Sequence, residues 1–222
     1  MKYPYRRACF STLTAVLLLS PSCFPLDTHL SEEAVREAYF LGQHHDKSVT
    51  DFLARYIKLL PVPETGPQIA SVAFYTPYAL LVLSSNERSF GYSAQQAELD
   101  HRGKDESVKI VIQIQLTPDY GPTTAVPTSP RSGAPVGFKL RPSDFWKDFQ
   151  VQVLNKDKTV TPLDFTGEPT YACDENGGCS LTGAILRLEF RAEKFTSDDV
   201  TVQVTPPDYD PIAVEFDLST LR

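Results

Sequence analysis

The sequence predicts a mostly β protein, an antiparallel β-sandwich preceded by a short α-helical hairpin. Two observations predict this fold. Segments that alternate apolar and polar residues follow one another through residues 67–222, without the long helical crossovers that parallel strands require. Before them, within residues 23–66, apolar residues recur at helical spacing. We therefore expect the helical hairpin over residues 23–66 and the sandwich over residues 67–222.

Two helices are expected in the hairpin. Ser31 is a good N-cap, and the acidic pair that follows it favours a helix N-terminus, with Gly42 just past the end of this first helix. Asp46 can cap a second helix, whose apolar positions from Val49 to Leu60 follow the i, i+3, i+4 pattern, and Pro61 then ends it. The apolar faces of both helices need a partner surface.

Strand patterns fill most of the remaining chain. Val108 to Leu116 alternate cleanly with polar residues, which indicates a half-buried strand. The run 78–83 is strand-like, with Pro77 as a break, and Ser93 with Gln96 predicts one short surface helix over residues 94–101. Further strand patterns lie at residues 72–74, 149–153, 160–165, 184–190, 200–204 and 212–216.

This succession of strands resembles immunoglobulin-like domains, in architecture only. Trp146 precedes both Cys173 and Cys179, which are six residues apart, so the Cys and Trp landmarks of antibody domains are absent. The fold itself does not indicate a function.

The connection over residues 117–137 is rich in proline. Five prolines between residues 118 and 135, with Gly, Ser and Thr, predict a long exposed loop without regular pairing. Binding residues lie disproportionately on such loops, so Tyr120 and Arg131 are candidate contacts for a protein partner or an envelope component. A loop without a binding role is the alternative.

The N-terminus has the pattern of a signal peptide over residues 1–22. Basic residues precede an apolar stretch from Ala8 to Leu19, and small residues at Ser20 and Ser22 precede Cys23. The stretch is shorter than the roughly 20 residues that span a bilayer. A small residue directly before Cys23 resembles the lipobox of exported bacterial lipoproteins, with Ser20 where Leu is usual. That resemblance implies a lipid on Cys23; cleavage without lipidation is the alternative.

The cysteine count favours lipidation. Cleavage removes Cys9, a lipid occupies Cys23, and Cys173 and Cys179 are left as a pair for a local disulfide in an oxidising compartment. Without the lipid, an exported chain would carry an odd thiol. A redox role would favour the C-x-x-C spacing, which the pair lacks.

Acidic and histidine clusters are the remaining candidates for chemistry. Asp174, Glu175 and Asn176, or Asp208 and Asp210, could offer oxygens to Ca²⁺, but neither group has the spacing of a calcium loop. The alternative is that they form solvated turns. The sequence His44-His45-Asp46 resembles a hydrolytic or zinc cluster. The alternative is structural: Asp46 caps the second helix, and the two histidines are exposed in the turn before it.

Charge and missing motifs narrow the function. A net charge of −7 argues against nucleic acid, which needs a clustered basic surface. The sequence has no phosphate loop, no nucleophile elbow and no dinucleotide fingerprint, so no cofactor is expected. We expect an exported bacterial envelope protein with a non-catalytic binding or structural role and an unidentified partner. The alternatives are a secreted module for sugar or Ca²⁺, and a hydrolase that uses the histidine cluster.

Overall fold

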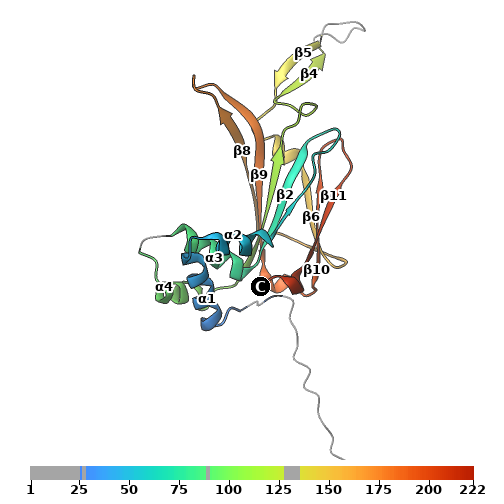
Figure 1. The fold of residues 1–222 in the computed structure, drawn as a ribbon. Helices are drawn as coiled ribbons and strands as arrows, with labels where there is room; N and C mark the ends of the chain where they lie inside the picture. The colour runs from blue at the N-terminus through green and yellow to red at the C-terminus, as the bar shows by residue number, and fades with distance from the viewer. Residues whose placement is uncertain (1–25, 27–28, 89–90, 128–135) are drawn as a thin grey trace, which may run out of the picture.

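The computed structural model describes Leu26 and residues 29–88, 91–127 and 136–222. These residues form a mostly β fold of antiparallel sheets with a cluster of helices at one end (Figure 1). The expected signal peptide, Cys23 and Arg131 lie outside the described residues. None of the helices in the described ranges is long and apolar enough to cross a bilayer.

The larger sheet has five antiparallel strands in the order β1-β2-β3-β9-β8. They are β1 (Ile57–Leu59), β2 (Gln68–Tyr75), β3 (Ser107–Gln115), β9 (Cys179–Arg191) and β8 (Asp164–Cys173). Strand β9 is longer than β3, and therefore the β8–β9 hairpin continues beyond the sheet. Gly183 is needed where β9 leaves β3, because a Cβ there would lie 2.1 Å from the carbonyl oxygen of Ile114.

The second sheet has four antiparallel strands in the order β11-β10-β6-β7. They are β11 (Ile212–Asp217), β10 (Asp199–Thr205), β6 (Gln150–Asn155) and β7 (Lys158–Val160). A separate hairpin joins β4 (Thr123–Pro127) to β5 (Val136–Leu140). Short 3₁₀ helices are η1 (Phe145–Asp148), η2 (Ala192–Lys194) and η3 (Leu218–Thr220).

The two sheets share one hydrophobic core. Alternate residues of each strand point inward, as the predicted alternation requires, and they pack against those of the other sheet. The first sheet contributes Val72, Phe74, Ile110, Ile112, Leu186 and Phe190, and the second contributes Val153, Val200, Val202, Val214 and Phe216. The antiparallel β-sandwich-like arrangement predicted from the sequence is thus present.

Four helices form a second, smaller core. They are α1 (Glu32–Gln43), α2 (Lys47–Ala54), α3 (Pro77–Glu87) and α4 (Ala94–His101). Helix α1 packs on α3 and α4, and Gly42 lies inside α1 at the closest approach, where a Cβ would be 2.5 Å from the carbonyl oxygen of Val82. The expectation that Gly42 follows the helix end is wrong by two residues, because packing on α3 is what requires a glycine there.

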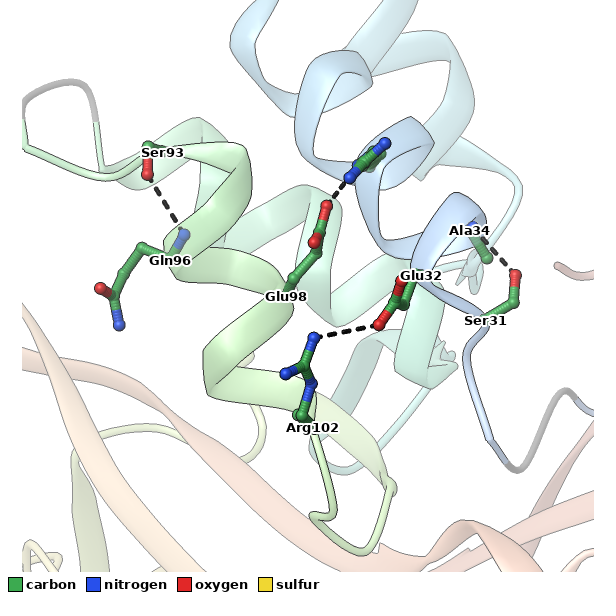
Figure 2. Close-up of polar contacts among 8 residues, drawn as sticks. Ser31, Glu32, Ala34, Ser93, Gln96, Glu98 and Arg102 are labelled. Atoms are coloured by element: carbon green, nitrogen blue, oxygen red, sulfur yellow. Dashed lines mark hydrogen bonds and ion pairs between the residues drawn. The ribbon is translucent and has the colours of Figure 1, made fainter.

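Side-chain caps begin α1 and α4, and ion pairs join the two helices (Figure 2). Ser31 and Ser93 accept hydrogen bonds from the backbone of Ala34 and Gln96, as their sequence positions predicted. Arg102 reaches Glu32 at 3.0 Å, and Glu98 is paired with Arg36. The first two turns of α1 are therefore joined to the C-terminal part of α4.

Three sequence expectations are corrected here. The run 78–83 belongs to helix α3, because Thr76 caps it and Pro77 occupies its first turn. The second helix of the hairpin ends at Ala54, and the chain continues as β1, which pairs with β2. Within the proline-rich segment, Thr123–Pro127 and Val136–Leu140 pair as the β4–β5 hairpin, so these parts are not an unpaired loop, and Pro127 lies at the end of β4.

Candidate functional site

The candidate site is a groove between the helical cluster and the outward face of the larger sheet. Its volume is about 620 Å³. One wall is α3, another is the connection from α4 to β3, and the floor is formed by β3 and β9. The lining is partly apolar and partly charged: Tyr75, Leu80, Leu83, Ser84, Glu87, Arg88, Tyr92, Asp100, His101, Lys104, Asp105, Glu106, Ser107, Lys109, Val111, Arg187 and Glu189 belong to it.

Strand alternation places the floor residues. Val108, Ile110 and Ile112 point into the core, so Lys109 and Val111 point to the opposite face. In the antiparallel register Lys109 lies opposite Glu189, and Val111 lies opposite Arg187. The sheet therefore presents a row of side chains with both charge signs to the groove. Helix α3 lies beside this row and supplies the apolar side chains of the lining.

Part of the charge in the groove is already paired within the protein. Arg187 is 2.7 Å from Glu168, and Arg88 lies 3.8 Å from Asp100 with its guanidinium over the ring of Tyr92. Within the described residues, neither Lys104 nor Lys109 has an ion-pair partner within 4.0 Å. The same holds for Glu87 and Glu189. The groove therefore offers unpaired groups of both signs to a ligand.

One imidazole lies beside a buried carboxylate at the rim. His101 Nδ1 is 3.6 Å from Glu106 Oε1, and the two side chains are 25% and 8% exposed. This pair also borders a second cavity of about 300 Å³ on the side of α1. The hydroxyl of Ser84 donates to the carbonyl of Leu81, and among the described residues no hydroxyl bonds to His101. The arrangement can hold a charged ligand, and the described residues assemble no activated nucleophile there.

The predicted disulfide between Cys173 and Cys179 is confirmed, with 4.0 Å between the two Cα atoms. It closes the tip of the β8–β9 hairpin. Inside that turn, Asp174 accepts hydrogen bonds at 2.9 Å from the backbone of Asn176 and of Gly178. The carboxylate is thus engaged in shaping the turn, while Glu175 and the side chain of Asn176 are exposed.

The second acidic group lies in the turn between β10 and β11. Asp208 and Asp210 border a hollow of about 510 Å³ together with Asp148. Within the described part of the chain, no three His, Cys, Asp or Glu side chains come together as a metal site. The hairpin acids and these turn acids therefore do not form one binding centre.

His44, His45 and Asp46 are all exposed, in the turn between α1 and α2. Each of the three side chains makes a different contact. Asp46 caps α2 by accepting from the backbone of Ser48, whereas His45 is 2.9 Å from Asn86 and His44 is 4.0 Å from Asp46. All three side chains lie at the surface, and the hydrolytic role of this cluster stays a prediction.

The expectation that Tyr120 is a partner contact is corrected by its burial. Tyr120 is 8% exposed and belongs to the main core. Its ring packs against Phe145 and Phe149, and the guanidinium of Arg141 lies 3.6 Å from the ring centroid. Burial raises the pKa of Tyr120, which the nearby Arg141 partly opposes. Arg131, its companion in that prediction, lies outside the described residues.

The groove was not found from the sequence. Lys109 and Glu189 carry an alternation signal that places them on the outward face, but nothing local indicates that α3 covers that face. Because the sequence pattern predicted a strand over residues 78–83, it did not predict α3, the helix that forms one wall of the groove. The chain matches no protein-family model, no curated protein and no solved structure, and the site is therefore interpreted from its own geometry.

Proposed function

We propose that this chain is an exported protein of the bacterial cell envelope that is tethered through a lipid on Cys23 and binds a protein partner without catalysis. The groove carries the binding part of the proposal. Its apolar α3 wall, and its unpaired Lys104, Lys109, Glu87 and Glu189, suit a peptide segment that carries both charge signs. A ligand of one charge would leave half of these groups unmatched.

Export has independent support. The Cys173–Cys179 disulfide is of the kind that persists in oxidising compartments, and the N-terminal residues have the signal-peptide and lipobox pattern. We also propose a distant immunoglobulin-like character for the sandwich. Two antiparallel sheets on one core support it, while the order β1-β2-β3-β9-β8 differs from the ABED and CFG sheets of immunoglobulin domains.

Photo-cross-linking from the groove tests the binding proposal. A benzoylphenylalanine in place of Val111, in the full chain expressed in a bacterial envelope, should yield a discrete cross-linked species. The same group in place of Gln115, on the same face of β3 but outside the groove lining, should not. Mass spectrometry of the cross-linked peptide should identify a partner segment with both acidic and basic residues.

Charge reversal supplies the decisive control. Lys104→Glu with Lys109→Glu should abolish the cross-link. Lys139→Glu with Lys158→Glu changes net charge equally on exposed strand positions elsewhere, and should leave the cross-link intact. If both double variants behave alike, or if only a lipid or small molecule is captured, the groove is not the protein-binding site.

A further inference from the structure

The folded body begins very close to the proposed lipid. Leu26 is only 2% exposed and belongs to the main core, together with residues of both sheets. Cys23 precedes it by three residues, with Phe24 and Pro25 between them. Three residues of fully extended chain span at most about 11 Å. The Cα of Cys23, the proposed site of the lipid, can therefore lie no farther than this from the Cα of a residue that is packed in the core.

The two ends of the molecule differ in their distance from that anchor. Helix α1 begins six residues after Leu26, so its N-terminus is at most about 20 Å from Leu26. Figure 1 shows α1, α4 and the C-terminus at one end of the molecule, and the tip of the β8–β9 hairpin with β4–β5 at the other. Strand β9 has 13 residues and runs between these ends, a rise of about 40 Å.

Ion pairs connect the helices to one another and to the larger sheet at the helical end of the molecule. Arg102 and Glu98 of the α4 segment pair with Glu32 and Arg36 of α1, which joins the two helices (Figure 2). At the base of β9, Arg191 lies 3.7 Å from Asp105 in the connection that follows α4. The helices and the larger sheet are thus linked to each other at the helical end.

We propose that the lipid-anchored protein stands on the bilayer with its helical end toward the membrane and its two hairpins pointing into the aqueous compartment. The proposal rests on the proposed lipid on Cys23. The bilayer surface faces the α1 end because the tether is too short to let the body turn over. The groove, which is walled by α3 and the residues after α4, then opens in the membrane-proximal half.

Energy transfer to the membrane tests this orientation. The full chain is lipidated in a bacterial host, purified and reconstituted into phosphatidylcholine vesicles that contain a head-group acceptor dye. A donor dye is attached at Glu33→Cys in α1 or at Lys139→Cys in β5. The native cysteines do not compete, since one carries the lipid and two form the disulfide. Transfer from position 33 should be several-fold more efficient than from position 139.

A lengthened tether gives the matched control. Twenty Gly and Ser residues inserted between Cys23 and Leu26 add a flexible reach of about 25 Å, and should bring the two efficiencies close together. Equal transfer with the native tether, or stronger transfer from position 139, overturns the orientation. A chain that stays unlipidated in the soluble fraction refutes the anchor itself. That outcome also removes the orientation, but it is distinguished because neither position transfers energy.

Discussion

At the scale of single residues, Asn155 shows how one buried amide connects distant parts of the chain. Its side chain is 3% exposed at the end of β6. The amide nitrogen donates to the carbonyls of Ser197 and Asp199, and the amide oxygen accepts from the backbone of Thr196 and Ser197. No local sequence pattern indicates this role, because the partners are about 40 residues away along the chain.

Asn155→Ala should lower the free energy of unfolding by about 3 kcal/mol, because several backbone groups near Ser197 lose their partner in a buried place. Urea denaturation at pH 7 measures this loss. Asn176→Ala is the control: that side chain is exposed in the β8–β9 turn, so its loss should change stability by less than about 0.5 kcal/mol. Equal effects of the two substitutions would contradict the role of Asn155.

Tyr56 gives a prediction about alkaline pH. Its hydroxyl donates to the carbonyl of Arg222 at 2.9 Å, and burial raises the pKa of Tyr56 above its ordinary value of 10.0. The unfolded chain ionises this tyrosine near pH 10 while the folded chain still holds the proton. The contribution of Tyr56 to stability is therefore complete below pH 10, and it is lost as the pH rises through the folded pKa.

Unfolding curves between pH 8 and pH 11 test this. Tyr56→Phe should cost about 1 kcal/mol at pH 8 through the lost hydrogen bond, and its stability should fall less steeply above pH 10. Burial also raises the pKa values of Tyr75, Tyr78 and Tyr120, so part of the decline persists. Tyr171→Phe, at an exposed position, should follow the wild-type curve.

At the scale of elements, α3 is a segment whose secondary structure the sequence pattern predicted wrongly. Residues 78–83 are apolar without interruption, and such a run is compatible with a buried strand or a buried helix. In the structure the helix is covered by the sheet and by α1, so it needs no polar face. A local signal for the helix was present, because Thr76 can cap it and Pro77 suits its first turn. The strand-like composition of residues 78–83 nevertheless favoured a strand.

Thr76→Ala should destabilise the protein by about 1 to 2 kcal/mol. The side chain is fully buried, accepts from the backbone of Ala79 at 3.2 Å and donates to the carbonyl of Arg222. Thr76→Ser keeps the hydroxyl and should retain most of the stability. Thermal unfolding compares the three proteins; a Ser variant as weak as the Ala variant would show that the methyl group, and not the cap, is what matters.

At the scale of the whole molecule, charge and anchoring act separately. Residues 1–22 hold three basic residues and no acidic ones, so the remaining chain has 18 basic and 28 acidic residues, a net charge of −10. Such a chain is repelled by anionic head groups. Under the proposed lipidation of Cys23, membrane attachment therefore comes from the lipid and not from the charge of the protein surface.

Cosedimentation with anionic vesicles separates the two contributions. The lipidated chain should pellet with the vesicles, and Cys23→Ser, which cannot take the lipid, should stay in the supernatant at low and at high salt. Intact mass before and after reduction shows the acyl groups and a gain of two hydrogens at the disulfide. Pelleting of the Cys23→Ser protein would instead reveal a membrane-binding surface in the folded body.

The sequence by itself determined the elements whose signals are local. The caps at Ser31 and Ser93, the alternation from Val108 to Leu116 and the Cys173–Cys179 pair all rest on neighbours within a few residues, and each is present as predicted. Only the tertiary structure decided that residues 78–83 are helical, that Tyr120 is core, and that α3 and β9 enclose a groove. Those outcomes depend on packing between segments far apart in the chain, whose burial free energy outweighs local preference.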